Sequence, residues 1–229
     1  MKRRSAAALV FGSAAALALS CASKEEVVQL QMGIEVVSQP EKAEVSYRGK
    51  SLGETPVTLD VKTYEDLQSI VASKEDLAIV EKRLRILSPD RAQLIFKFGK
   101  EEQSPIAKVI GVENVLIFDY SEKVAFDVEK FDLKAEFLPI LNTQADILTV
   151  YFPRAEVYVC GYTDATGTEE YNLRLSLKRA QAVADYLVAR GVDKERLKIR
   201  GFGKQYPVES NATTAGRSLN RRTEVILTQ

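Results

Sequence analysis

Between residues 156 and 228 the spacing of the apolar residues changes period more than once, and this pattern constrains the possible fold more than any other feature of the chain. Apolar and polar residues alternate in AEVYVCG, residues 155–161, as they do in a strand. A helical spacing of three and four follows, which predicts one buried stripe of Leu173, Leu177, Ala180, Ala184 and Leu187. Arg190 and Gly191 then form a C-terminal helix signal, and RLKIRG and RTEVILT, residues 196–201 and 222–228, predict two more strands.

The preceding segment extends this alternation. KVAFDVEKFDL, residues 123–133, predicts a strand that ends near Asp127, and the apolar period of residues 132–150 predicts a helix. IAKVIGVENVLIF, residues 106–118, predicts a further strand that joins the same domain. The order β-α-β-α-β-β is typical of an α+β sandwich with helices on one face of a mixed sheet.

Residues 33–98 predict a small β-rich domain, because short β-rich runs alternate with loops that contain Gly and Pro. KTYEDLQSIVASKEDLAIVEK, residues 62–82, is the one segment that favours a helical excursion. GKEEQSP, residues 99–105, is interpreted as a linker, so residues 106–229 are expected to fold alone. The β-rich part resembles the PEGA domain in the order of Ser38, Pro40, Ala43, Val45, Gly49, Gly53, Thr55 and Pro56. A generic β-domain without an assignable ligand explains the same pattern.

The N-terminus is typical of a targeting segment. MKRR precedes an apolar run at residues 5–19, which is shorter than the ~20 residues that a membrane-spanning helix needs. Residues 1–20 therefore predict a signal peptide, and the Ser20–Cys21 junction resembles a bacterial lipoprotein signal with Cys21 as the lipidated residue. An ordinary secretory signal is the alternative. Residues 21–32 are expected to form a polar leader, and Cys160 is expected to be a small buried apolar residue.

Composition limits the chemistry. The chain has no His, which removes the commonest general base and zinc ligand; this does not exclude an enzyme, but it removes most of the usual catalytic groups, and no metal or cofactor is predicted. Residues 156–229 hold 12 basic and 9 acidic residues, whereas residues 21–155 hold 17 and 23. A mildly basic C-terminal third suits an anionic ligand, but its charge density is too low to favour nucleic acid.

Polar residues on one flank of the long predicted helix suggest a binding site. Asn172, Ser176 and Arg179 follow the helical repeat, and helical side chains lean toward the N-terminus, where Asp164 lies in the preceding loop. An acid and a base with hydrogen-bonding groups between them would form a receptor for a zwitterion. A direct salt bridge between Asp164 and Arg179 is the alternative.

Several motifs in order resemble a known family. Residues 118–229 contain GYTD, NLRLSLKRA, GFGKQYP and NATTAGRSLNRR, and so resemble the OmpA-like C-terminal domain of outer-membrane proteins, peptidoglycan-associated lipoproteins and flagellar stator proteins. Tyr162 departs from the family, which commonly has His there. The resemblance implies a non-catalytic domain that binds the diamino acid of the peptidoglycan stem peptide. It implies a role for Asp164 at the ligand ammonium and for Arg179 at its carboxylate, with Thr163, Asn172, Asp127, Arg217 and Arg222 as further ligand-binding residues.

The expected function is a lipid-anchored protein of the outer membrane, facing the periplasm, that binds peptidoglycan and tethers the membrane to the wall. A wall-binding part of a larger, stator-like envelope machine is the first alternative. A peptidoglycan hydrolase that uses paired carboxylates is the second.

Overall fold

The computed structural model describes residues 27–99, 105–111, 115–121, 125–127 and 129–228. The signal peptide, Cys21 and most of the predicted linker lie outside these residues. The N-terminal β region comprises β1 (Gln29–Gln39), β2 (Glu44–Tyr47), β3 (Lys50–Glu54), β4 (Val57–Thr63), α1 (Tyr64–Gln68), β5 (Ile70–Ser73), β6 (Ala78–Ser88) and β7 (Arg91–Gly99). The C-terminal part comprises α2 (Pro105–Ile110), β8 (Val115–Ser121), α4 (Leu138–Val150), β9 (Val157–Gly161), α5 (Glu169–Ala189), β10 (Leu197–Gly201), α6 (Thr214–Asn220) and β11 (Arg222–Thr228), with single 3₁₀ turns at Ala135–Phe137 and Lys194–Arg196.

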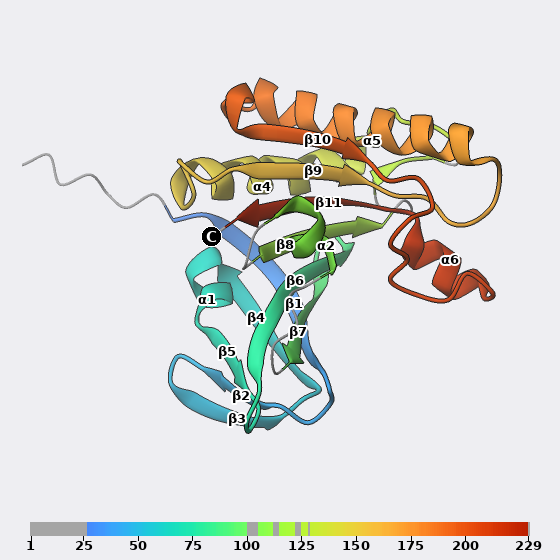
Figure 1. The fold of residues 1–229 in the computed structure, drawn as a ribbon. Coiled ribbons are helices and arrows are strands. Elements are labelled where there is room, and N and C mark those ends of the chain that lie inside the picture. The colour runs from blue at the N-terminus through green and yellow to red at the C-terminus, as the bar shows by residue number, and fades with distance from the viewer. Residues whose placement is uncertain (1–26, 100–104, 112–114, 122–124, 128, 229) are drawn as a thin grey trace, which may run out of the picture.

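Strands from both parts form one eight-stranded mixed sheet in the order β10-β9-β11-β8-β6-β7-β1-β4 (Figure 1). A second sheet, β3-β2-β5, lies at the end farthest from α5 (Figure 1). The α+β class, with a β region followed by a mixed sheet with helices, is therefore confirmed. The domain boundaries and the PEGA identity of the β region stay predictions.

The two parts meet through strand pairing. β6 runs parallel to β8, with Lys82 opposite Leu116 and Ile86 opposite Tyr120. β8 in turn pairs antiparallel with β11, which places the C-terminal strand inside the sheet. The backbone hydrogen bonds of the sheet thus continue from one part into the other, although the predicted linker separates the two parts in the sequence.

One face of the sheet carries the main apolar core. α4 and α5 cover it at the C-terminal end, where Leu141, Leu148, Val183 and Leu187 are fully buried. At the other end α1, β2 and β5 cover the same core with Leu67, Val45 and Ile70. Burial of apolar side chains on both sides of the β6–β8 pair explains why the two parts form one continuous core.

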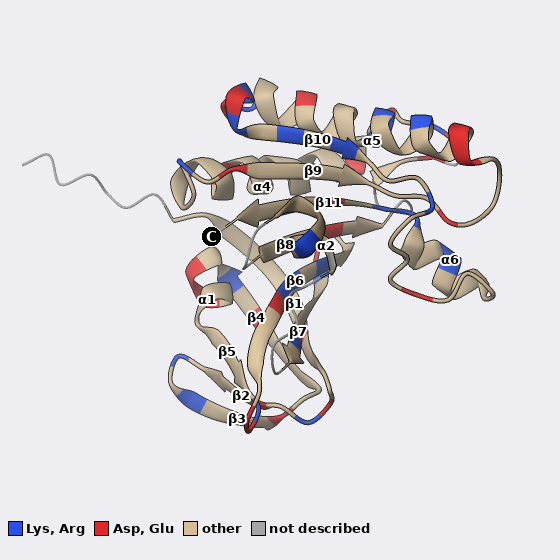
Figure 2. Cartoon of the chain, viewed as in Figure 1, with Lys and Arg blue, Asp and Glu red and all other residues tan. Residues whose placement is uncertain are grey.

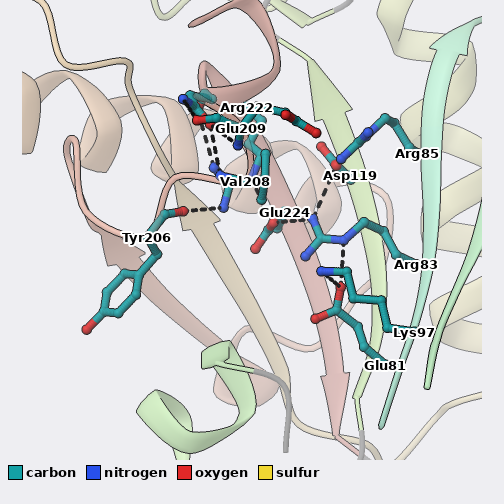
Figure 3. A network of polar contacts seen from close by, with 11 residues as sticks. Glu81, Arg83, Arg85, Lys97, Asp119, Tyr206, Val208, Glu209, Arg222 and Glu224 are labelled. Carbon is teal, nitrogen blue, oxygen red and sulfur yellow. Dashed lines mark hydrogen bonds and ion pairs between the residues drawn. The ribbon is translucent and has the colours of Figure 1, made fainter. Parts of the chain in front are cut away.

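The opposite face carries buried charges where β6, β8 and β11 meet. Glu81, Arg83, Asp119, Arg222 and Glu224 are each at most 4% exposed. Arg83 donates to Glu81 at 2.9 Å, to Asp119 at 3.2 Å and to Glu224 at 2.5 Å, and Figure 3 shows its guanidinium between these carboxylates. Paired and hydrogen-bonded charges can be buried at tolerable cost, whereas unpaired ones cannot. We name Glu81, Arg83, Asp119, Arg222 and Glu224 the charge cluster.

The structure corrects several local expectations. The predicted strand ending near Asp127 is absent from the described residues, where Phe126 forms a single bridge with Leu133 and β8 is the first strand of the C-terminal part. IAKVIGVENVLIF begins as α2, a helix, before β8 starts at Val115. β1 begins at Gln29, within the segment for which a polar leader was predicted. The helical excursion at residues 62–82 is limited to α1, which a capping box at Thr63 and Asp66 starts.

The buried face of α5 also differs from the prediction. Ala180, Ala184 and Leu187 are buried as expected, but Leu173 and Leu177 are 49% and 46% exposed. In the first half of α5 the polar residues Asn172, Ser176 and Arg179 face the protein instead. The burial of Cys160 is confirmed.

The free edge of the large sheet at β10 carries positive charge, which Figure 2 shows in blue along this strand. Lys198 and Arg200 lie on it, and charged residues on an edge strand oppose pairing with other chains. Within the described residues no helix is both long and apolar enough to span a membrane.

Candidate functional site

Glycines let α5 approach the sheet closely at the site. A β-carbon at Gly161 would lie well under 3.0 Å from the carbonyl oxygen of Ser176, and one at Gly201 would lie 2.7 Å from the backbone nitrogen of Leu177. The hydroxyl of Ser176 accepts a 2.9 Å hydrogen bond from the backbone N–H of Gly203, which ties the loop after β10 to the helix. The absence of side chains at these glycines explains why a polar flank of the first half of α5, rather than Leu173 and Leu177, packs on the strands.

The loop between β9 and α5 lines a cavity. Thr163, Asp164, Thr166 and Gly167 of this loop contribute to it, and the N-terminal half of α5 contributes Tyr171, Asn172, Leu175 and Arg179. Glu129 and Arg221 complete the lining, and the cavity has a volume of about 520 Å³. Two carboxylates and two guanidinium groups therefore face one space, as a zwitterionic ligand requires.

Asp164 is held in a fixed position on the cavity wall. One carboxylate oxygen accepts from the backbone N–H of Thr166 at 2.8 Å and from the Thr166 hydroxyl, and the other accepts from Nη1 of Arg221 at 2.6 Å. Burial alone would raise the pKa of Asp164, but the hydrogen bonds from Thr166 and Arg221 lower it below its usual range. Asp164 is therefore ionised at neutral pH.

Arg179 lies at the base of the cavity and is 2% exposed. Its Nε donates to the carbonyl of Lys130 at 2.9 Å and its Nη2 to the carbonyl of Asp127 at 3.4 Å. The guanidinium also lies over the Phe126 ring, 5.1 Å from its centroid. These contacts anchor the segment around residues 126–130 to α5, so Arg179 supports the cavity wall and adds positive charge beneath it.

Arg221 is the cationic partner of Asp164. It belongs to the motif NATTAGRSLNRR, but it was not among the predicted ligand-binding residues. It follows α6 directly, and Asn220 before it fixes the local backbone: its Oδ1 accepts from the N–H groups of Val208 and Glu209 at 2.9 and 3.0 Å. Arg221 retains 27% exposure of its side chain, compared with 7% for Asp164. Because 57 residues separate Arg221 from Asp164, only its place in the NRR motif could have indicated from the sequence that it belongs to the site.

The predicted site residues divide into two groups. Asp164, Arg179, Asn172 and Thr163 line the cavity, and Asn172 donates to the carbonyl of Thr166 at 2.7 Å, which braces the loop. The alternative of a direct Asp164–Arg179 salt bridge does not fit, because Arg221 pairs with Asp164.

Asp127, Arg217 and Arg222 do not line the cavity. The Asp127 carboxylate is 58% exposed beside Lys130 and Lys134. Arg217 donates to the carbonyls of Asn211 and Ala212, within the loop that precedes α6. The side chain of Arg222 is buried at the start of β11, where it donates to Glu224 and lies over the Tyr162 ring. Tyr162, at the position where histidine was expected, thus packs in the interior and not on the cavity wall.

The OmpA family matches residues 125–221, the segment that contains every residue of the cavity lining, and this part of the chain is an OmpA-family domain. "Probable lipoprotein YiaD" of Escherichia coli is 39% identical over 112 residues, which are 49% of this chain and 51% of YiaD. "Peptidoglycan-binding protein ArfA" of Mycobacterium tuberculosis is 45% identical over 104 residues, 45% of this chain and 32% of ArfA.

A solved structure of the peptidoglycan-associated lipoprotein from Burkholderia pseudomallei is 31% identical, with a TM-score of 0.43, and the match covers 46% of this chain and 88% of that one. The chain spans about half of YiaD and a third of ArfA. The matched segment lies in the C-terminal part, and the N-terminal β region is outside the family match.

Proposed function

We propose that the chain is a lipid-anchored protein of the cell envelope whose C-terminal part binds peptidoglycan without cleaving it. The observation that carries the proposal is the cavity in the OmpA-family segment, where Asp164 and Arg221 present opposite charges beside the buried Arg179. A diamino acid of the stem peptide offers an ammonium and a carboxylate on one carbon. Asp164 and Arg221 lie side by side on the cavity wall and are complementary in charge to these two groups.

The geometry supports a role for each group. An ionised carboxylate has about four lone-pair positions, and three described donors reach Asp164, which leaves a position for a ligand ammonium. The planar guanidinium of Arg221 can hold a ligand carboxylate with two parallel hydrogen bonds. Arg179 lowers the cost of burying that second negative charge. The site is therefore assigned to Asp164 and Arg221 as contact residues, with Asn172 and Thr166 as loop supports.

The names of two relatives support this proposal. The name of ArfA states peptidoglycan binding, and the name of YiaD states a probable lipoprotein. With Cys21 acylated, the lipid would hold the chain in the outer membrane while the OmpA-family part reaches the wall. Replacement of Cys21 by Ala should leave an unprocessed precursor or a form that partitions into the aqueous phase. Metabolic labelling with palmitate checks this, and an unlabelled wild-type protein would contradict the anchor.

Sedimentation with purified peptidoglycan tests the binding site. Asp164→Asn keeps the shape of the side chain but removes the charge, and charge-assisted hydrogen bonds contribute ~1.5–3 kcal/mol, so affinity should fall at least about tenfold. Arg221→Gln should have a similar effect. Asp185→Asn is the matched control, because Asp185 is an exposed residue of α5 outside the cavity lining, and it should bind like wild type.

Two outcomes would contradict this assignment. If Asp164→Asn and Arg221→Gln bind peptidoglycan as tightly as wild type and only melt at a lower temperature, the ion pair stabilises the fold and does not bind the ligand. Release of soluble fragments from the wall would favour the hydrolase.

A further inference from the structure

A second cavity lies between the sheet and α4 and shares no residue with the peptidoglycan site. Its walls come from β1, β6, the turn after β6, β8 and α4, so it is located where the β region meets the OmpA-family segment. Its volume is about 160 Å³, and Leu84, Ile86 and Phe118 form a floor that is at most 3% exposed. None of its lining residues carries a charge.

One polar pair interrupts this apolar surface. The hydroxyl of Tyr120 on β8 donates to Oε1 of Gln144 on α4 at 2.7 Å, and both residues are at most 2% exposed. The Nε2 amide group of Gln144 is buried and has no hydrogen-bond partner among the described residues. Buried polar groups are hydrogen-bonded in the great majority of cases, and an unsatisfied donor costs about 1–3 kcal/mol.

The chemistry of the cavity limits what can satisfy this donor. The ligand must present a hydrogen-bond acceptor to Nε2, since an amide NH₂ group only donates. It must be neutral, because the lining offers no counter-charge and an unpaired buried ion is costly. The remainder must be apolar to match the leucine, isoleucine and phenylalanine walls. An apolar cavity of ~150 Å³ holds a molecule as large as benzene, so the size suits a compact ring or short chain.

We propose that this cavity binds a small, neutral, mostly apolar molecule with one carbonyl-type acceptor, which takes its hydrogen bond from Nε2 of Gln144. The ligand contacts β1 and β6 of the β region and β8 and α4 of the C-terminal part at the same time. Binding therefore stabilises the junction between them and raises the melting temperature of the whole chain.

Acetophenone and cumene are matched probes. Both place a benzene ring beside a three-atom branch of similar shape, but only acetophenone carries a carbonyl oxygen. Their binding is measured by NMR titration and thermal shift on the chain from residue 21 onward with Cys21→Ser, so that no acyl chain competes. We expect saturable acetophenone binding, about fivefold tighter than that of cumene, as one net hydrogen bond provides.

Variants separate the hydrogen bond from the cavity. The double variant Tyr120→Phe/Gln144→Leu removes both members of the polar pair together, which leaves no new unsatisfied group. It should bind acetophenone more weakly than cumene, because the ketone oxygen is then buried without a donor. Thr143→Phe fills the mouth of the cavity and should abolish binding of both, whereas Thr149→Phe, on the same helix but outside the lining, should not.

The proposal fails if wild type binds neither probe at millimolar concentration and a crystal structure shows only a water molecule at Gln144. It also fails if wild type does not distinguish acetophenone from cumene, because the amide would then make no contribution.

Discussion

Gly161 lies where β9 passes beneath α5, and the space there admits no side chain. We predict that Gly161→Ala lowers the free energy of unfolding by about 1–3 kcal/mol, since the added methyl group must displace the backbone of Ser176. Peptidoglycan affinity should fall as well, because the shifted helix carries Asn172 and Arg179. Urea unfolding and wall sedimentation measure the two effects.

Gly33→Ala is the matched control for Gly161→Ala. Gly33 also lies in a strand of the large sheet, but its nearest neighbour would be 3.6 Å from an added β-carbon, an ordinary van der Waals contact. We expect unfolding and affinity close to wild type. A Gly161→Ala protein as stable as Gly33→Ala would contradict the close packing of α5 on β9.

At the same scale, the sequence predicted half of the central ion pair. Asp164 was identifiable because it follows a strand and precedes a long amphipathic helix. Arg179, which is near in the sequence and on the same flank of α5, was expected to contact the ligand carboxylate, and its ion pair with Asp164 was only an alternative. The pairing with Arg221 depends on where the loop before α6 returns to the sheet, and hydrophobic periodicity carries no information about that path.

Among the elements, β6, β8 and β11 are joined by the charge cluster as well as by backbone hydrogen bonds (Figure 3). Burial would raise the pKa of Glu224, but Arg222 and Arg83 hold it well below its usual range. Burial would likewise lower the pKa of Arg83, but Glu224, Glu81 and Asp119 raise it well above its usual range. The folded state therefore favours the ionised forms of Glu224 and Arg83, which link β11 to β6.

The lowered pKa of Glu224 predicts an acid dependence of stability. A carboxyl group with a depressed folded-state pKa stabilises the fold above its unfolded-state pKa, near 4.5, and loses this contribution as the pH falls toward the folded-state value. Glu224→Gln should therefore destabilise the protein clearly at pH 6 and much less at about pH 2.5. Urea unfolding of both proteins at several pH values measures this. A difference that stays constant with pH would show that the ionised carboxylate contributes nothing.

The sequence predicted α4, α5, β9, β10 and β11 because each has a local period and clear end signals. It predicted a strand over residues 106–118, whereas the strand begins only at Val115 and α2 precedes it, since a short, mostly apolar run such as residues 106–111 fits a helix or a strand equally. Leu173 and Leu177 follow a helical stripe, yet glycines on the adjacent strand and loop admit Ser176 to the interior instead. Local spacing therefore located α5 but not its contact face.

Over the whole molecule, the linker interpretation and the continuous sheet lead to different expectations for residues 106–229. The sequence led us to expect that residues 106–229 fold alone, because the segments before and after the predicted linker each have their own hydrophobic pattern. In the structure, β8 pairs with β6. Asp119 on β8 accepts hydrogen bonds from Arg83 and Arg85, and both arginines belong to the β region. A fragment without β6 would expose one edge of β8, so we expect it to unfold at a lower urea concentration than the full chain.

Asp119→Asn gives the sharpest test of this coupling, and it is made in both the full chain and the 106–229 fragment. In the full chain Asp119 is 2% exposed and accepts from Arg83 and Arg85 at 3.2 and 3.0 Å, so the substitution should cost about 2 kcal/mol. In the fragment both arginines are missing and the side chain lies on a free edge strand, so the cost should be about zero. Urea unfolding of the four proteins gives the two differences. Equal costs in the chain and the fragment would show that the β region does not support the OmpA-family segment through Asp119.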